Sequence, residues 1–235
     1  MGNNPEQDCK RLKQLERMTK VKNYLSLIKF SHTIFALPFA LIGFFLAIKT
    51  GLFEDGIKKT FPGMDAETRD ILYIKYFFIK FGLVLFCMIF ARSAAMAFNR
   101  YLDRNFDAKN PRTSIREIPA GIISANSALL FTILTSVLFI ITTYFINSLC
   151  FYLSPVALLV VLGYSFTKRF TPLCHLVLGL GLALAPIGAY LAVTGSFALL
   201  PILFSFTVLF WVSGFDIIYA LQDEEFDKEY TPYQT

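Results

Sequence analysis

The stretch "LVLFCMIFARSAAMAFNRYLDRNFDAKNPRT", residues 83–113, runs from an apolar segment into a dense group of acids, bases and amides. Its first half suits lipid, where a spanning helix needs roughly 20 apolar residues. The whole chain is similarly apolar, because 55% of its residues are hydrophobic and 16% aromatic, with a mean hydropathy of +0.56. This composition predicts a polytopic membrane protein and excludes an ordinary soluble domain.

Several segments are long enough to cross a bilayer, and all are expected to be helices because a lone strand leaves its backbone polar groups unpaired in lipid. They are residues 30–48, 77–98, 122–146, 149–166, 173–193 and 197–219. Small residues recur in the fifth segment and predict close helix packing there: Gly179, Gly181, Ala183, Ala185 and Ala189.

The net charge of +5 is unevenly placed. Lysines and arginines crowd the N-terminal arm, the loop after the second segment and the turn after the fourth, whereas the turns after the third and fifth carry no charge. The positive-inside rule therefore predicts that the N-terminus, these two basic loops and the C-terminal tail are cytoplasmic, with residues 50–76 outside. We expect the chain to consist of a basic cytoplasmic arm (1–24), a transmembrane domain (25–229) and a tail (230–235). Attraction to anionic lipid is a sufficient alternative explanation for the basic arm.

Two groups of oxygen-bearing side chains lie where segments leave the membrane. Asn99, Asp103 and Asp107 are four residues apart, so a helix places them on one face. Tyr219, Asp223 and Asp227 repeat this spacing after the last segment, and Asp216 precedes them inside the apolar run. An ionisable group at that depth is a functional candidate, since insertion costs it roughly 2.5–3.5 kcal/mol. A solvated helix end and a charged tail remain the structural alternatives.

The two groups predict a metal site. Carboxylates that face each other repel unless a cation lies between them. Oxygen ligands without thiolate or imidazole favour Mg²⁺ over Ca²⁺ or Mn²⁺, and Mg²⁺ is typically held by carboxylates together with substrate phosphates. The nearby basic residues are consistent with a diphosphate substrate. His32 and His175 are expected to be isolated, and the scattered cysteines are expected to be small apolar fillers.

Several stretches together resemble the UbiA superfamily of intramembrane prenyltransferases, in particular its 4-hydroxybenzoate polyprenyltransferase branch. These stretches are "IKFSHTIFALPFALIG", "NRYLDRNFDAKNPRT", "REIPAGIIS", "YSFTKRFT" and "DIIYALQDEEFD". The resemblance implies an all-α, polytopic transmembrane helical bundle with about six spans of that family's nine-helix fold. Because family members continue beyond the second motif, we expect a truncated or partial chain, or a natural short form.

The resemblance also implies site residues and partners. The metal and diphosphate motifs, which are also the catalytic residues, would be Asn99, Asp103, Asp107, Asp223 and Asp227. Substrate-binding residues would be Arg92, Arg112, Tyr164, Lys168, Arg169, Asp216 and Tyr219. The expected cofactor is Mg²⁺, and the expected partners are a polyprenyl diphosphate, an aromatic acid and the lipid bilayer, without nucleic acid.

The implied reaction is transfer of the polyprenyl group to a 4-hydroxybenzoate-type acid in ubiquinone biosynthesis, at the bacterial inner membrane. A naphthoate-type acceptor in menaquinone biosynthesis, or a non-catalytic fragment, remains an alternative. Some of the 26 phenylalanines would line a tunnel for the prenyl tail. A transporter would instead carry its ionisable groups near the bilayer midplane. A CDP-alcohol phosphotransferase would need glycine-spaced aspartates that this sequence lacks.

Overall fold

The computed structural model describes residue 19, residues 21–171 and residues 173–221. Every regular element within this part of the chain is a helix, which confirms the all-α prediction. The labelled helices are α2 (Phe30–Lys49), α3 (Leu52–Thr60), α4 (Ala66–Asp107), α5 (Ala125–Ile146), α6 (Ser148–Thr167), α7 (Cys174–Thr194) and α8 (Leu199–Ala220).

The apolar helices are those of an integral, multi-pass membrane protein. Among the described residues, five helices (α4 to α8) are long and apolar enough to span a bilayer. Residues Ile34–Lys49 of α2 and the whole of α3 form a further candidate span, bent by 56° at the break between them. The predicted six segments therefore correspond to α2 and α4–α8.

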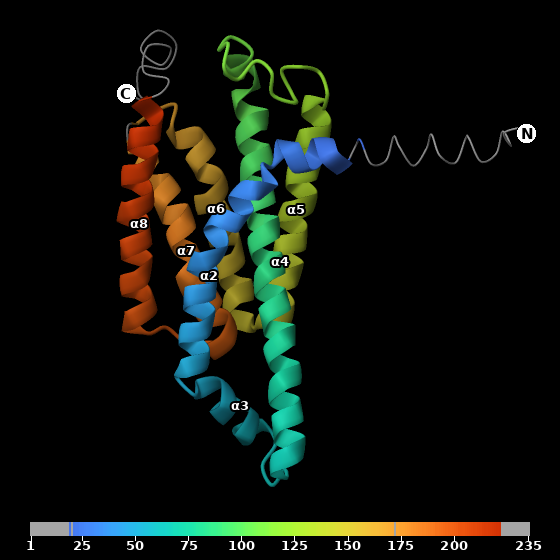
Figure 1. Cartoon of the computed structure of the whole chain (residues 1–235), viewed down its shortest axis with the longest axis vertical. Coiled ribbons are helices and arrows are strands. Elements are labelled where there is room, and N and C mark those ends of the chain that lie inside the picture. The colour runs from blue at the N-terminus through green and yellow to red at the C-terminus, as the bar shows by residue number, and fades with distance from the viewer. Residues whose placement is uncertain (1–18, 20, 172, 222–235) are drawn as a thin grey trace, which may run out of the picture.

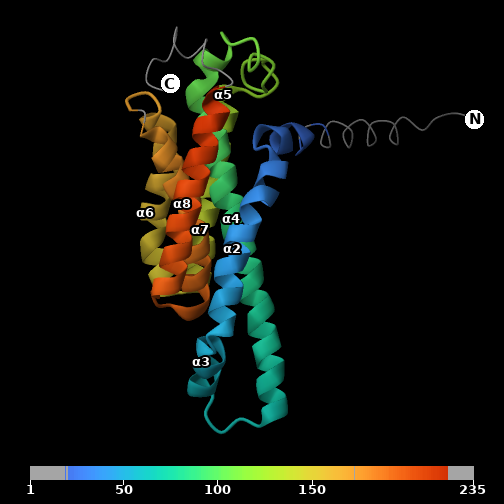
Figure 2. The same ribbon diagram turned by 60° about the vertical axis from the view of Figure 1, so that its left-hand side comes forward.

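The long helices run side by side along the longest axis of the molecule (Figures 1 and 2). Helix α7 packs against α8, α2 and α6, while α4 packs mainly against α5. Helices α4 and α8 both finish at the upper end of Figure 1. We call this the motif end, because Asn99, Asp103 and Asp107 lie in the last turns of α4. The α5–α6 and α7–α8 turns lie at the opposite, far end.

Helix α4 is longer than the apolar pattern predicts. Its 42 residues begin at Ala66 and not at Phe77, and they extend about 63 Å at 1.5 Å per residue, twice the hydrocarbon thickness. The Asp65 side chain caps the helix by accepting from the Thr68 N–H at 2.8 Å. The extra turns project beyond the bundle beside α3 (Figure 2). The hydropathy pattern therefore predicted only the apolar part of a longer helix.

Two glycines lie where helices approach each other closely, and one of them, Gly179, belongs to the predicted set of small residues. A Cβ atom on Gly179 of α7 would collide with the Leu209 carbonyl and the Ser213 hydroxyl of α8. A Cβ atom on Gly43 of α2 would collide in the same way with the Pro186 carbonyl of α7. Without side chains at these two positions, α8 and α2 can both pack closely on α7.

Candidate active site

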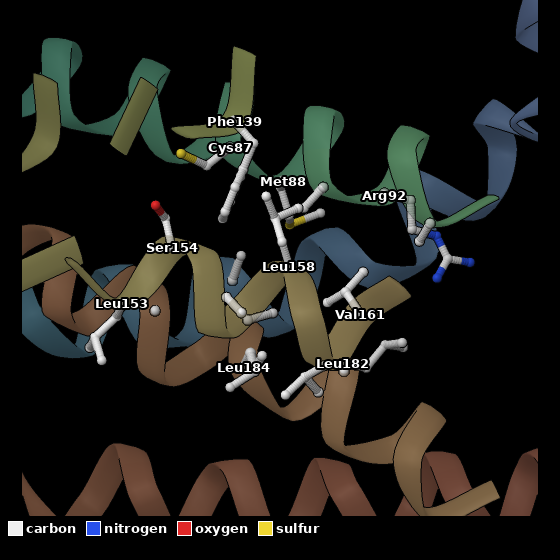
Figure 3. Close-up of a pocket in the computed structure, with 18 of the residues that line it drawn as sticks. Cys87, Met88, Arg92, Phe139, Leu153, Ser154, Leu158, Val161, Leu182 and Leu184 are labelled. Carbon is white, nitrogen blue, oxygen red and sulfur yellow. The ribbon is translucent and has the colours of Figure 1, made fainter. Parts of the chain in front are cut away.

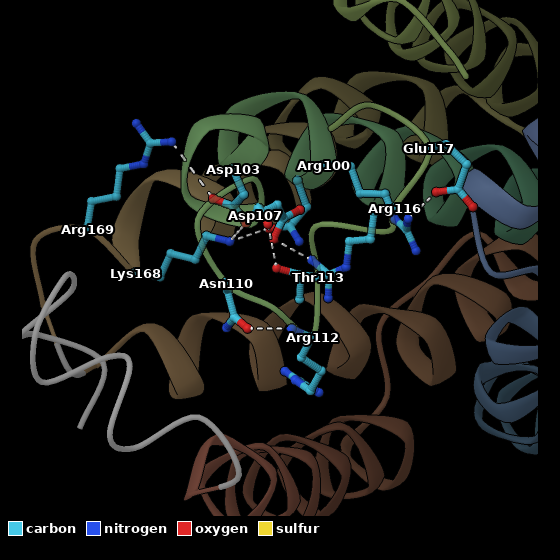
Figure 4. A network of polar contacts seen from close by, with 11 residues as sticks. Arg100, Asp103, Asp107, Asn110, Arg112, Thr113, Arg116, Glu117, Lys168 and Arg169 are labelled. Atoms are coloured by element: carbon cyan, nitrogen blue, oxygen red, sulfur yellow. Dashed lines mark hydrogen bonds and ion pairs between the residues drawn. The ribbon is translucent and has the colours of Figure 1, made fainter. Parts of the chain in front are cut away.

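The first polar motif lies on one buried face of α4, at the motif end. Asp103 and Asp107 are both buried there. Lys168, in the turn after α6, forms an ion pair with Asp103 and donates to the Asn99 side-chain oxygen at 2.7 Å (Figure 4). Its neighbour Arg169 donates to the Leu102 carbonyl at 2.7 Å and lies 3.8 Å from the other Asp103 oxygen. The fold thus brings together two predicted stretches that are far apart in sequence.

The loop after α4 turns back over the same face. Arg116 Nη1 lies 2.7 Å from Asp107 Oδ1. The Thr113 hydroxyl donates to the Asp107 carbonyl at 3.1 Å. The second carboxylate oxygen of Asp107, Oδ2, is buried and has no hydrogen-bond partner among the described residues. Asp107 therefore keeps one acceptor oxygen available for a ligand.

Further basic groups gather beside this loop. Arg100 forms an ion pair with Glu117, which also accepts from the Ser26 hydroxyl (Figure 4 shows the arginine and the glutamate). Burial, together with the positive charges of Arg100 and Arg116, lowers the pKa of Lys29, which lies just before α2. A surplus of positive charge at one place is favourable for binding a polyanion.

The end of α8 reaches the same region. The Arg112 guanidinium lies 5.9 Å from the centre of the Tyr219 ring. The last described turn of α8 is therefore close to the loop that follows α4. Asp223 and Asp227, the acidic residues of the second predicted motif, lie outside the described residues.

The residues present fit a hard divalent cation. Asn99, Asp103 and Asp107 offer only oxygen atoms, and one of these is the unpartnered Asp107 Oδ2. Within the described part of the chain, no group of three or more His, Cys, Asp or Glu side chains could hold a metal ion. Two carboxylates and an amide are nevertheless the kind of partial ligand set that Mg²⁺ completes with water and substrate phosphates.

An apolar cavity of 420 Å³ opens beside this polar cluster. Asn99, Arg92 and Tyr164 are its polar wall residues near the motif end. Aliphatic side chains and Met88 line much of the rest, with Cys87 and Cys150 toward the far end (Figure 3 labels several). Phenylalanine contributes little to the lining, through Phe139 and Phe197. The expected aromatic tunnel is therefore mainly aliphatic along its described walls.

Hydrogen bonds hold the helix ends together at the far end of the cavity. The Asn147 side chain caps α6 by accepting from the Cys150 N–H at 2.8 Å, and it donates to the Leu191 carbonyl of α7 at 2.8 Å. Lys80 of α4 donates to the Ile146 carbonyl, where α5 ends. A cation is favourable at a helix C-terminus, so the Lys80 contact stabilises the end of α5. Together these hydrogen bonds link α4 to α5 and α6 to α7 at the far end.

Residues 73–231 match the family described as "UbiA prenyltransferase family". The chain belongs to the UbiA prenyltransferase family. The resemblance stated from the motifs is thereby confirmed, and the all-α membrane bundle is the fold of the family's solved members.

Named relatives and solved structures agree with this assignment. A 4-hydroxybenzoate octaprenyltransferase of Tolumonas auensis is 37% identical over 136 residues, which cover 58% of this chain and 48% of that protein. The apo structure of a UbiA homolog from Aeropyrum pernix K1 matches with a TM-score of 0.65 and 29% identity, over 84% of this chain and 66% of that one.

A UbiA homolog from Archaeoglobus fulgidus, bound to GPP and Mg²⁺, has the same fold, with a TM-score of 0.56 and 22% identity over 90% of this chain and 67% of that one. The chain spans about half the length of the curated relatives it matches.

One polar pair of this UbiA protein escaped the sequence analysis. His175, expected to be isolated, lies with its Nδ1 2.8 Å from the Asp216 carboxylate. The residues are on α7 and α8, 41 positions apart. No local spacing relates them, and the only available signal was that each is a polar group inside an apolar segment. Arg92 lacks such a partner for its Nε, which is buried without a hydrogen bond in the described part of the chain.

Proposed function

We propose that this UbiA chain carries a site for Mg²⁺-dependent transfer of a polyprenyl group from an allylic diphosphate to an aromatic acid of the 4-hydroxybenzoate type. The observation that supports this most directly is the position of Asn99. Its side chain accepts from Lys168 in the charged cluster and also lines the apolar cavity. A charged head and an apolar tail of one substrate can therefore be bound side by side.

The charged cluster would bind the diphosphate. Asn99, Asp103 and Asp107 would hold Mg²⁺, with Asp223 and Asp227 completing the set. Bound Mg²⁺ would neutralise charge on the diphosphate as it leaves. Lys168, Arg169 and Arg112 would supply fixed positive charge to the same oxygens. In the ligand-free arrangement Lys168 instead pairs with Asp103, so binding requires it to exchange a carboxylate partner for a phosphate partner.

The apolar cavity would hold the isoprenoid tail. Its wall follows α4 from Val84 to Asn99, a rise of about 22 Å at 1.5 Å per residue. A pocket with apolar walls and a few polar groups at one end favours a ligand that has an apolar tail and a polar head. The tail would lie along the helices, with its reactive carbon at the motif end.

The acceptor would bind between the motif end of the cavity and the charged cluster. Arg92 lines the cavity at one edge of its lining (Figure 3), and its Nε atom is buried without a partner among the described groups. A carboxylate is the natural partner of such a guanidinium, which suits an aromatic acid. Tyr164 lines the same end, while Tyr219 would border the site from α8. The relative named as a 4-hydroxybenzoate octaprenyltransferase supports this acceptor class.

The orientation follows from the charges. Lys168, Arg169 and the loop after α4 place most basic residues at the motif end. The positive-inside rule then favours a cytoplasmic motif end in a bacterial inner membrane. The proposed division keeps residues 1–24 as a cytoplasmic arm, 25–229 as the membrane domain and 230–235 as a tail.

Transfer by the full chain in membranes tests the proposal. Membranes are incubated with labelled prenyl diphosphate and a panel of aromatic acids, and the product is identified by mass. We expect a prenylated acid that disappears with a chelator and with Asp103→Asn. Asp70→Asn is the matched control, because Asp70 is an exposed aspartate at the opposite end of α4. Absence of product from folded chain, or full activity in Asp103→Asn, contradicts the proposal.

A further inference from the structure

The His175–Asp216 pair is a partly buried polar unit that the proposed diphosphate chemistry does not use. Only 13% of the His175 side chain and 20% of the Asp216 side chain are exposed. An ionised carboxylate can only accept a hydrogen bond, so the proton of neutral His175 is assigned to Nδ1 and points at Asp216. The other ring nitrogen, Nε2, then carries the lone pair. It has no hydrogen-bond partner among the described residues.

This pair adjoins the polar end of the cavity. Asp216 lies close enough to Tyr164 for its charge to act on the tyrosine hydroxyl, and Tyr164 lines the cavity. The Lys168 ammonium lies 6.0 Å from the centre of the Tyr164 ring. A set of polar side chains therefore runs from the Asn99–Lys168 cluster past Tyr164 to the histidine.

Few other charged groups act at this corner. His175 faces Asp216 on α8. Tyr164 on α6 and Lys168 in the turn after α6 lie next to this pair. The Cys174 thiol, on α7 itself, also lies within reach of the charges of Asp216 and Lys168. Helix α2 carries one titratable group in residues 34–49, Lys49, at its other end. On α4 the charged groups at this level are Arg92, which lines the cavity, and Asp103, which Lys168 neutralises.

Prenylation of an aromatic ring releases a proton that needs an acceptor. The bond between the donor carbon and the diphosphate oxygen breaks with its electrons on the diphosphate, and a ring carbon bonds to the donor carbon. The ring C–H bond then breaks, its electron pair restores aromaticity, and the proton leaves. The described lining of the cavity holds no aspartate, glutamate or histidine that could keep this proton.

We propose that His175, oriented by Asp216, takes up this ring proton at Nε2 through the hydroxyl of Tyr164, the member of this group that lines the cavity. This assignment rests on the proposed function. Asp216 fixes the tautomer and stabilises the imidazolium that forms, which is the role a carboxylate plays behind a catalytic histidine. The partly exposed imidazole can then release the proton toward the motif end.

Kinetics of His175→Gln test the assignment against a merely structural role. A glutamine amide can still donate to Asp216 but cannot accept a proton. We expect a rate loss of about 10²-fold or more.

The test uses 4-hydroxybenzoate deuterated beside its hydroxyl, with geranyl diphosphate as donor. The isotope effect should be small in the parent chain and large in the variant, because proton removal becomes slow. Added imidazole should partly restore His175→Ala.

Ser213→Ala is the matched control, since Ser213 lies in the same α7–α8 seam and donates only to the Leu209 carbonyl of its own helix. It should retain both rate and isotope effect. A His175→Gln variant with normal rate, or with a lower rate but an unchanged isotope effect and no imidazole rescue of His175→Ala, overturns the assignment.

A spectroscopic measurement keeps the inference testable without turnover. The chain has only two histidines, so ¹⁵N-histidine labelling with His32→Gln isolates the His175 signal. We expect a neutral ring protonated at Nδ1, and a mixed tautomer in Asp216→Asn. A ring protonated at Nε2, or a spectrum unaffected by Asp216→Asn, overturns the inference. Failure of the parent chain to make any product contradicts the proposed function instead, and the two results are thus distinguishable.

Discussion

Lys168 and Asn99 are separated by 69 positions in the chain, yet the lysine ammonium donates to the asparagine side-chain oxygen at 2.7 Å. The same ammonium pairs with Asp103, and both charged side chains are 11% exposed. A cation from the turn after α6 thus lies against the carboxylate face of α4. In the proposed function this contact would rearrange, because the lysine would exchange the carboxylate for a phosphate partner.

The first prediction concerns the ion pair between Lys168 and Asp103. Removing one partner leaves an uncompensated buried charge, so Asp103→Asn or Lys168→Met alone should destabilise the ligand-free protein by about 3–5 kcal/mol. The double variant should lose less than the sum of the two, because no unpaired charge remains. Unfolding in detergent measures all three. Glu54→Gln, which breaks the exposed pair with Lys58, should change little. Additive losses would show that the pair is not coupled.

A second prediction addresses the contact between α7 and α8. Gly179→Val places a side chain where the Leu209 carbonyl and Ser213 hydroxyl already lie, so we expect a loss of about 1–3 kcal/mol. Gly163→Ala in α6 is the control, because a Cβ there meets no heavy atom within 4 Å. Alanine is the better helix former by about 0.5–1 kcal/mol, so this control should be slightly stabilising. An unchanged melting temperature for Gly179→Val would contradict the close packing.

Tail length provides a third prediction. Ala157 lines the cavity from α6, and Ala157→Phe would fill space along the proposed path of the tail. If it displaces about two buried methylene groups, long-tailed prenyl diphosphates should bind roughly tenfold more weakly. A five-carbon donor should bind as before. The control is Leu159→Phe, at a position of α6 that is 73% exposed. Equal losses for short and long donors would place the tail elsewhere.

A fourth prediction uses the titration of Lys29. Burial and the neighbouring Arg100 and Arg116 charges lower its pKa below the usual 10.5, so the unfolded lysine binds its proton more tightly than the folded one. Between the folded and unfolded pKa values the unfolded state holds more protons, and this group's contribution to stability therefore rises with pH up to about 10.5.

Lys29→Gln should accordingly be more stable than the parent at neutral pH, and its stability should depend less on pH over that window. Unfolding in detergent at a series of pH values measures this. Lys22→Gln, at an exposed position, controls for the general loss of a positive charge. Added inorganic pyrophosphate should reduce the difference between the parent and Lys29→Gln. A deficit of the parent relative to Lys29→Gln that stays constant or grows as pH rises contradicts the assignment.

Local chemistry allowed the sequence to predict most of the architecture. Apolar length alone marks the spans, since a single segment in lipid can pair its own backbone polar groups only as a helix. The spacing of Asn99, Asp103 and Asp107 places them on one face because a helix repeats every 3.6 residues. The start of α4 was missed because hydropathy detects only apolar runs, whereas the first turns of this helix mix charged and apolar residues and begin under an Asp65 cap.

By itself the sequence determined the helices, the family motifs and the oxygen-only chemistry of the first acidic face, because each depends on residues within a few turns of one another. Only the tertiary structure decided which charges meet. Lys168 reaches Asp103, Arg116 reaches Asp107, and His175 reaches Asp216. The first and last of these contacts join separate helices, whose relative rotation and depth depend on packing at residues such as Gly43 and Gly179. Such packing is a property of the whole bundle, and no local spacing records it.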